Sequence, residues 1–185
     1  MKITTLVENT SVSPEHGRHV GITPGEDRRN ASRSEDSTFV YDTSWGRVAI
    51  TADGGAVTRV SWGVPDLAVG QGSNALVDMA AMQLEEYFTG RRTKFTVPLR
   101  PEGTEFQRLV WRALQDIPYG ETRSYKQVAQ AIGRPSASRA VGMANNKNPI
   151  MVMIPCHRVV GADGSLVGYA AGLAVKQRLL ELERR

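Results

Sequence analysis

The chain has 185 residues, 41% of them hydrophobic, enough for a hydrophobic core in one domain or two small ones. A single cysteine excludes an internal disulfide, and the lack of a signal-peptide pattern or a bilayer-length apolar run predicts a cytoplasmic protein without membrane contact. The net charge of +4 is uneven: residues 102–185 carry 12 basic and 7 acidic residues and residues 1–101 carry 11 and 12, so a polyanion such as nucleic acid would dock on the C-terminal half.

Residues 1–37 are rich in Ser, Thr, Glu, Arg, Gly and Pro and show no sustained period of 2 or 3.6. Such a segment buries little apolar surface, so we expect a flexible N-terminal segment. His16 and His19 have a spacing seen in metal sites, but Pro14 and Gly17 disfavour a helix there. No metal site is expected.

Residues 38–97 predict a small α/β domain. Short β-branched or aromatic runs separated by turn residues indicate a strand meander, with a further strand before the prolines at 98 and 101; the runs are residues 39–41, 46–50, 57–62 and about 94–97. Apolar residues at helical spacing follow Ser73 or Asn74 as the N-cap, and Gly90 ends that helix. No catalytic constellation is visible in this domain, so we expect it to serve as a scaffold.

Residues 98–103 form a linker to a mainly helical domain over residues 104–185. Two capping boxes begin its first helices, Thr104 with Gln107 and Ser124 with Gln127. Gly133 ends the second of these helices, and the third is predicted to have Ser136 as its N-cap and to run to about Asn145. Two short helices joined by a Gly-containing turn are typical of a helix-turn-helix.

The third helix offers one long polar side chain, Arg139, among small residues in its first turns. Small residues allow close approach of the backbone but read few base edges, which favours weak sequence specificity and docking in the minor groove. The alternative is a pair of packed helices that binds nothing.

Residues 150–154 are continuously apolar and are predicted to form a buried strand, after which Pro155 interrupts regular structure directly before Cys156. A lone cysteine is more often a small buried hydrophobe than a nucleophile. Here, His157 supplies a base and Arg158 supplies positive potential, which are the surroundings of a reactive thiol. Adjacent side chains in a strand point apart, so relay through a water is as plausible as direct contact between Cys156 and His157.

The segment after Val160 turns at residues 162–165 and continues into a small-residue loop at 168–172, in which Tyr169 offers a ring against a planar ligand. The last helix is expected to turn apolar residues inward: Leu173, Val175, Leu179, Leu180 and Leu182. A carboxylate at its end would orient His157 as the third member of a thiol relay. The residues alone do not choose between Glu181 and Glu183.

The sequence PCHRV at residues 155–159, with Asn148-Pro149 before it and LLELE at residues 179–183 after it, closely resembles the O6-alkylguanine-DNA alkyltransferases. These are also called methylated-DNA-protein-cysteine methyltransferases. The similarity covers residues 104–183 and includes residues 117–122 and 138–142. It implies an α+β protein, with a small ribonuclease-H-like α/β domain at residues 38–97 before a helical, winged-helix-like domain that contains the helix-turn-helix.

The resemblance also implies roles for individual residues. Cys156 would accept the alkyl group, activated through a water by His157, and Glu183 rather than Glu181 would complete the relay. Asn148 would hold the turn behind the third helix, Tyr125 would donate a hydrogen bond to the leaving guanine, and the pocket would be formed by the main chain of Cys156 and Val159 together with Tyr169 and Ala170. The DNA-binding residues would be Arg139, which replaces the flipped nucleotide, and Ala137, Gly142 and Ser124.

The implied function is repair by irreversible, single-turnover transfer of an alkyl group from O6-alkylguanine, and also O4-alkylthymine, in double-stranded DNA to a monomeric protein without a cofactor. Ala170 stands where some relatives have a serine, which should weaken assistance to the leaving group. Ala171 stands where glycine is common, which should narrow the pocket. Three other functions remain open: a binding protein for alkylated bases that transfers nothing, a helix-turn-helix regulator, and a thiol hydrolase.

Overall fold

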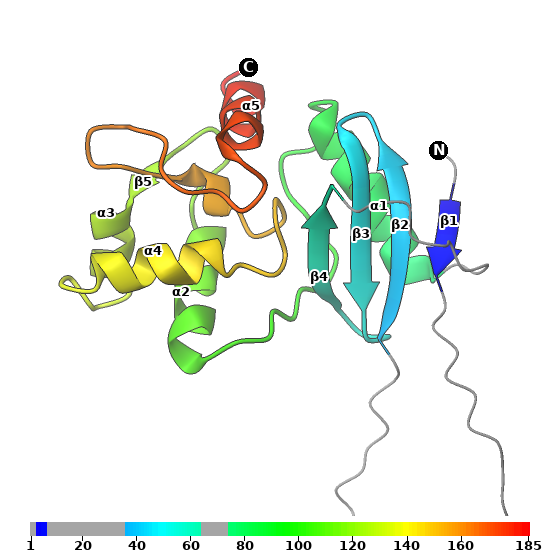
Figure 1. Ribbon diagram of the computed structural model, residues 1–185, viewed down its shortest axis with the longest axis horizontal. Coiled ribbons are helices and arrows are strands. Elements are labelled where there is room, and N and C mark those ends of the chain that lie inside the picture. Colours follow the sequence, from blue (N-terminus) through cyan, green and yellow to red (C-terminus); the bar gives the residue numbers. More distant parts are fainter. Residues whose placement is uncertain (1–2, 7–35, 64–73) are drawn as a thin grey trace, which may run out of the picture.

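The computed structural model describes residues 3–6, 36–63 and 74–185, which form a small sheet domain and a helical domain packed side by side (Figure 1). The mixed α/β fold class predicted from the sequence is confirmed. Within the described ranges, no helix combines the length and apolar character needed to cross a bilayer.

An antiparallel sheet forms the first domain, with its strands in chain order: β1 (Ile3–Leu6), β2 (Ser37–Thr43), β3 (Gly46–Ala52) and β4 (Val57–Trp62). The β3–β4 turn is stabilised by Asp53, whose side chain accepts hydrogen bonds from the backbone N–H groups of Gly55 and Ala56. The three strand runs predicted in residues 39–62 are therefore confirmed.

Strand β1 differs from the expectation of a flexible segment over residues 1–37. It pairs with the edge of β2, with Ile3 opposite Tyr41 and Leu6 opposite Thr38. An open edge strand offers unpaired backbone groups to any extended segment, and a four-residue run is too short to show a period. The rest of that segment, including His16 and His19, lies outside the described residues.

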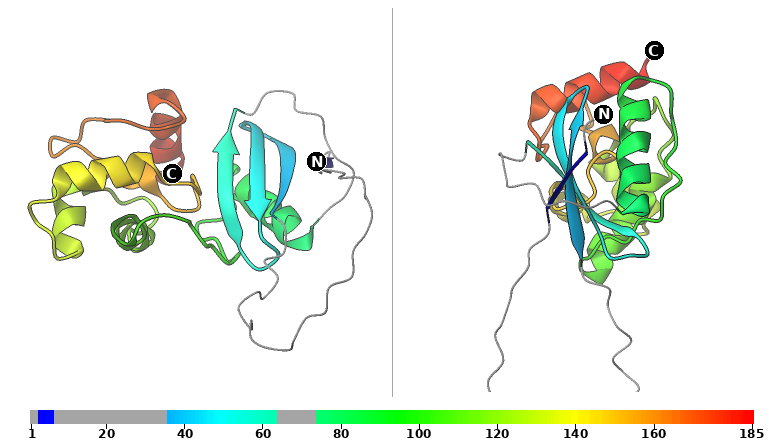
Figure 2. Two further views of the ribbon diagram at one scale, coloured as in Figure 1. Left: turned by 60° about the horizontal axis from the view of Figure 1, so that its bottom comes forward. Right: turned by 90° about the vertical axis from the view of Figure 1, so that its right-hand side faces the viewer.

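Helix α1 (Ala75–Phe88) packs on the sheet, as Figure 2 shows. Its N-cap is Asn74, one of the two candidates, whose side chain accepts from Leu76 N. The strand predicted at 94–97 is wrong. Gln83 of α1 binds Thr96 through both its amide nitrogen and its amide oxygen, so this segment is held by a side chain and not by a strand ladder.

The second domain contains helices α2 (Glu105–Gln115), α3 (Tyr125–Ala131), α4 (Ser138–Asn146) and α5 (Leu173–Glu183), the 3-10 helix η1 (Cys156–Arg158), and a short parallel pair, β5 (Arg123–Ser124) and β6 (Val159–Val160). Both capping boxes are confirmed, at Thr104 and at Ser124. The Ser136 cap is wrong: Ala137 N donates to Arg134 O in a turn, so α4 begins after Ala137 without a side-chain cap.

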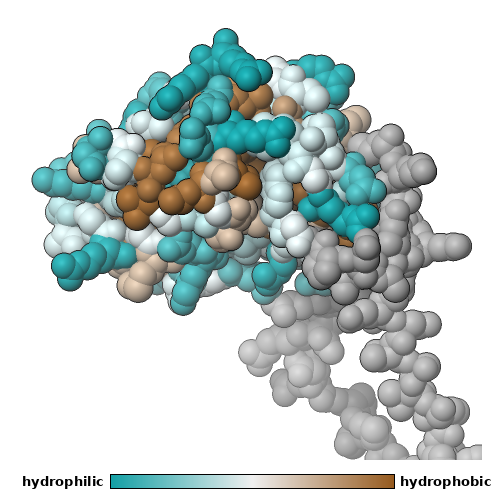
Figure 3. Space-filling model, turned by 45° about the horizontal axis from the view of Figure 1, so that its top comes forward, coloured by the Kyte–Doolittle hydropathy of each residue, from teal (hydrophilic) through white to brown (hydrophobic). Residues whose placement is uncertain are grey.

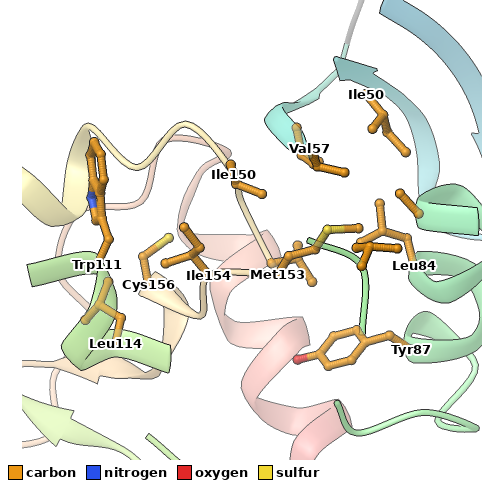
Figure 4. Packing of buried hydrophobic residues seen from close by; sticks show 14 of the residues in the cluster. Ile50, Val57, Leu84, Tyr87, Trp111, Leu114, Ile150, Met153, Ile154 and Cys156 are labelled. Carbon is orange, nitrogen blue, oxygen red and sulfur yellow. The ribbon is translucent and has the colours of Figure 1, made fainter. Parts of the chain in front are cut away.

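The apolar run at 150–154 forms a turn and not the predicted strand. Val152 has φ of 71°, and Ile154 N donates to Ile150 O at 3.0 Å. Figure 4 shows why the run is apolar: Ile150, Met153 and Ile154 fill the space between the two domains. The backbone there also joins the sheet, because Val60 N donates to Pro149 O at 2.9 Å.

The inward face of α5 is partly as predicted. Leu179 and Leu180 are buried, whereas Leu173 is 48% exposed. Lys176 and Glu183 are buried in its place, because each has polar partners inside the domain. Helix α5 also touches the first domain through Arg178, whose guanidinium lies 3.9 Å from the centre of the Trp45 ring.

Candidate active site

Cys156 opens η1, directly after Pro155, and its thiol is buried. Asn148 donates from Nδ2 to Cys156 Sγ at 3.1 Å and to Ile154 O at 2.9 Å, while its Oδ1 accepts from Ile150 N at 3.0 Å. Asn145, at the end of α4, donates to Cys156 O at 3.2 Å. The thiol is thus held between the end of α4 and the turn at 150–154.

His157 lies against Glu183, with 2.7 Å between Nε2 and Oε1, and both side chains are buried. Glu181, the other candidate, is exposed and accepts a hydrogen bond from Gln177. An ionised carboxylate only accepts, so the hydrogen-bond network assigns the proton to Nε2 and leaves Nδ1 as an acceptor. That Nδ1 is buried and has no hydrogen-bond partner in the described part of the chain. His157 and Cys156 share no direct hydrogen bond there.

Three further groups surround Glu183. Arg158 Nε donates to both carboxylate oxygens, at 3.1 and 3.0 Å, and Gly120 N donates to Oε2 at 3.0 Å. The hydroxyl of Tyr87, from α1 of the first domain, also donates to Oε1. The carboxylate therefore accepts from donors in three segments of the chain, which fixes its position next to His157.

The protonation states follow from these contacts. Burial disfavours ionisation of Glu183, but hydrogen bonds from His157, Arg158 and Tyr87 outweigh it and lower the pKa of this carboxyl to about 2. Burial lowers the pKa of His157 despite Glu183, and burial raises the pKa of the Cys156 thiol despite Asn148 and Lys176. At neutral pH the site thus combines a neutral thiol, a neutral imidazole and an ionised carboxylate.

A cavity of about 340 Å³ opens on the helical domain next to α4. Its lining residues are Tyr125, Ser138, Arg139, Gly142, Asn146, Val167 and Gly168. Two donors hold the loop on its far side: Tyr125 Oη at 3.2 Å and Lys176 Nζ at 2.8 Å both bind Val167 O. Figure 3 shows apolar side chains gathered on this half of the molecule within a polar surround.

The remaining predicted residues lie around these two centres. Val159 is buried in β6, and its carbonyl accepts from Lys176 Nζ at 2.6 Å. The Tyr169 hydroxyl is buried without a hydrogen-bond partner among the described residues, and its pKa is raised by burial and by the Cys156 thiol. Ala170 is exposed. The structure therefore brings Cys156, His157, Glu183 and Asn148 together.

The predicted DNA-binding residues lie on or beside the two helices that follow Gly120. Arg139 is exposed on α4, and Gly142 lies one turn further along, where a Cβ added to it would lie 3.7 Å from ring atoms of Tyr125. Ala137 is the N-cap of α4. Ser124 caps α3, and its hydroxyl accepts from Gln127 N at 3.2 Å, so this side chain is occupied within the fold.

Sequence reasoning missed three polar residues of the site. Tyr87 lies on the apolar stripe of α1, where its spacing is that of a core residue. Lys176 and Asn145 are likewise buried on helices that read as ordinary amphipathic segments. The one available signal was the position of Lys176 on the predicted apolar face of the last helix, because a lysine buried there requires polar partners inside the protein.

Two family models match the chain. One, described as the ribonuclease-like domain of 6-O-methylguanine DNA methyltransferase, covers residues 39–101, and the other, its DNA binding domain, covers residues 105–185. A methylated-DNA--protein-cysteine methyltransferase of Methanosarcina barkeri is 62% identical over 104 residues, 56% of this chain and 66% of that protein. One of Mycobacterium leprae is 50% identical over 127 residues, 69% of this chain and 72% of that protein. The match thus spans about two thirds of the relatives' length.

Solved structures agree in fold. The Mycobacterium tuberculosis O6-methylguanine methyltransferase is 42% identical, with a TM-score of 0.69 over 78% of this chain and 90% of that one. The Mycobacterium tuberculosis protein OGT in complex with DNA is 43% identical, also with a TM-score of 0.69, over 78% of this chain and 91% of that one.

Proposed function

The chain belongs to the 6-O-methylguanine DNA methyltransferase family, and from that premise we propose that it repairs DNA by taking an alkyl group from O6 of guanine onto Cys156. The observation that carries the proposal is the buried Cys156 thiol, held by Asn148 and adjacent in the chain to the paired His157 and Glu183. The cysteine, the base and the oriented carboxylate are the three parts that an activated thiol requires.

Activation begins from the neutral thiol. His157 Nδ1 is the free acceptor of the imidazole, and a water between it and Cys156 Sγ would satisfy this buried nitrogen and carry the thiol proton to it. The imidazolium that forms donates from Nε2 to Glu183, which stays ionised throughout because its pKa is about 2. A thiolate is produced only when the relay works, so the buried cysteine is protected from unspecific oxidation.

Transfer is an in-line displacement at the alkyl carbon. The Sγ–C bond forms, the C–O6 bond breaks, and its electron pair stays on the guanine, which becomes a better leaving group when donors meet its developing charge. Tyr125 is the donor that we assign to the guanine. Its pKa is raised by burial, so it remains a hydroxyl, and it would exchange its present bond to Val167 O for one to the base. Tyr169 then lines the pocket beside the thiol.

The guanine O6 cannot reach a buried thiol while the base is stacked, so the nucleotide is flipped out at a cost of a few kcal/mol. Helix α4 suits the minor groove because its small residues allow close approach, and Arg139 takes the vacated place in the stack. Ala137, Gly142 and Ser124 lie along the same surface. The domain over residues 104–185 thus contains both the acceptor thiol and the DNA-binding helix, and residues 38–97 support it.

The thioether product is stable, and one cysteine serves one transfer, so each monomer acts once and without a cofactor. O4-alkylthymine presents the same alkyl–oxygen bond and is included as a second substrate. Ala170 leaves only its backbone N–H for the substrate oxygen where a serine would add a hydroxyl. Ala171 narrows the pocket, so methyl groups should be preferred to bulky ones.

The test is the mass of the protein after incubation with free O6-benzylguanine and with a duplex that contains O6-methylguanine. We expect one benzyl or one methyl adduct per chain, located on Cys156 and absent from Cys156→Ser. A protein that binds the methylated duplex but keeps its mass would contradict alkyl transfer. That result would instead favour a protein that binds alkylated bases without transferring the group.

A further inference from the structure

Tyr87 reaches the active site from the other domain. It lies on α1, is fully buried, and its ring packs against Phe95 and Tyr119, with centroids at 5.2 and 5.9 Å. Its hydroxyl donates to Glu183 Oε1 and lies 3.2 Å from His157 Nε2. No apolar packing requires a hydroxyl there, because a phenylalanine ring would fill the same volume.

The direction of the hydrogen bonds can be assigned. Glu183 is ionised and only accepts, so both His157 Nε2–H and the Tyr87 hydroxyl donate to the same oxygen, Oε1. Two donors on one oxygen, with Arg158 spanning the carboxylate and Gly120 on the other oxygen, leave Glu183 one orientation. The donor from Tyr87 is the only one of these that comes from the sheet domain within the described ranges.

We propose that Tyr87 is a positioning residue for alkyl transfer: its hydroxyl donates to Glu183 Oε1, the oxygen that also accepts from His157 Nε2, and thereby limits how strongly the carboxylate attracts the imidazolium. This inference rests on the proposed function. Because Tyr87 belongs to the sheet domain, the docking of that domain on the helical domain becomes part of the Cys156–His157–Glu183 relay. The first domain thus contributes a polar group to the reaction, whereas the sequence predicted only a scaffold.

The effect on protonation has a definite sign. The charged or titratable groups around His157 are Glu183 and Lys176 from α5, Arg158 and Cys156 from η1, and Tyr87 from α1. Removal of the Tyr87 hydroxyl leaves Glu183 with one hydrogen-bond donor fewer. The carboxylate then attracts the protonated His157 more strongly, which raises the pKa of His157 and favours the imidazolium. His157 must be neutral to accept the thiol proton, so the acid limb of the rate profile should move to higher pH.

The experiment measures the rate of benzyl transfer from free O6-benzylguanine between pH 5 and 9 for the full chain and for Tyr87→Phe. We expect the acid limb of Tyr87→Phe to move up by about one pH unit, which makes the reaction about tenfold slower on the acid side of that limb. The free base avoids any contribution from DNA binding.

The matched control is Tyr41→Phe. Tyr41 is another fully buried tyrosine of the sheet domain whose hydroxyl donates to a carboxylate, Asp78 Oδ1 at 2.7 Å, and in the described part of the chain it makes no hydrogen bond to His157 or Glu183. Tyr41→Phe should lose a similar amount of stability, measured by the melting temperature. Its rate of benzyl transfer should depend on pH in the same way as that of the unsubstituted protein.

The outcomes separate the two proposals. If the unchanged protein forms no adduct, the proposed function fails. If it reacts and Tyr87→Phe shows the same limb or a limb at lower pH, the role of Tyr87 is overturned. A displaced limb in both Tyr87→Phe and Tyr41→Phe would also overturn it, because general loosening of the sheet domain would then explain the shift.

Discussion

Glu183 shows at the scale of one residue how structure and reaction depend on the same contacts. Its carboxylate is buried and accepts from His157, Arg158, Tyr87 and the backbone of Gly120. Breaking a buried ion pair by removing one partner leaves the other charge without compensation, which costs more than the pair itself contributes. Loss of this carboxylate should therefore lower both the stability of the fold and the rate of alkyl transfer.

For Glu183→Gln we expect a loss of about 3 kcal/mol in the free energy of unfolding, because Arg158 remains buried without its counter-charge. Alkyl transfer should slow by about a hundredfold, because the imidazolium loses its carboxylate. Urea unfolding and the adduct rate measure the two effects. Glu181→Gln is the control: this exposed carboxylate should change stability by less than about 0.5 kcal/mol. Equal effects of both substitutions would contradict the assignment of Glu183.

Stability should also fall in acid. The pKa of Glu183 is lowered from 4.5 to about 2, so its contribution is complete above about pH 4.5 and is lost as the pH falls toward 2, an amount of about 3 kcal/mol. His157 acts in the same direction, since its pKa is lowered from 6.5 and the unfolded chain takes up the proton first. Urea unfolding at a series of pH values should show a decline that is smaller in Glu183→Gln.

Which residues could be predicted depended on how local their signal was. Cys156, His157 and Glu183 stand in recognisable motifs, and the resemblance chose Glu183 where spacing alone left Glu181 open. Tyr87 could not be found, because its partner Glu183 is 96 residues away and its position on α1 has the period of a core residue.

At the scale of elements, α4 combines the proposed surface for DNA with weak internal support. It lacks a side-chain cap, and its middle contains Gly142, whose added Cβ would meet the Tyr125 ring at an ordinary 3.7 Å. The fold therefore tolerates alanine at this position, so the proposed approach of DNA to the outer side of the helix would account for the glycine.

For Gly142→Ala we expect the free energy of unfolding to rise by about 0.5 to 1 kcal/mol, because glycine is unfavourable inside a helix. Affinity for a duplex with O6-methylguanine should fall, because the methyl group keeps the backbone from the groove. Urea unfolding and fluorescence anisotropy with labelled DNA check the two halves. Unchanged affinity would place the DNA away from this turn of α4.

For Arg139→Ala we expect repair in a duplex to slow by at least about tenfold, since the flipped nucleotide loses the side chain that fills its place. Reaction with free O6-benzylguanine should be largely kept. Arg112→Ala, on the exposed side of α2, removes the same charge elsewhere and should leave both rates unchanged. Equal loss on both substrates would show that Arg139 acts in the pocket and not in the base stack.

Elements with local signals were predicted and those without were not. The capping boxes at Thr104 and Ser124 depend on residues three apart, and both are present. The strand expected at 150–154 rested on apolar content, which a buried turn between domains satisfies equally well. Residues 94–97 have the composition of a short strand, but the backbone N–H of Thr96 donates to the side chain of Gln83 and not to a neighbouring strand.

At the scale of the molecule, the sheet domain and the helical domain share one core, in which Ile150 and Met153 lie between them (Figure 4). Trp45 stacks on Phe88 at 4.9 Å and receives Arg178 from α5 on its ring. The two-part arrangement followed from the sequence, but the closeness of the docking did not, because it depends on pairs from distant segments.

We expect urea to unfold the chain in one cooperative transition, because neither domain can lose its partner without exposing apolar core. Tryptophan fluorescence reports on both domains, with Trp45 and Trp62 in the first and Trp111 in the second, and far-UV circular dichroism reports on the helices. The two signals should give the same midpoint. Two resolved midpoints would contradict a shared core.

The order of the relay along the chain also sets when the thiol can first react during synthesis. Cys156 and His157 leave the ribosome before α5, which contains Glu183, and a chain made at about 5 to 20 residues per second folds behind the point of synthesis. Until α5 packs, His157 lacks its carboxylate and the thiol remains unactivated. Under the proposed single-turnover transfer, the cysteine would therefore become reactive only when the last helix completes the domain.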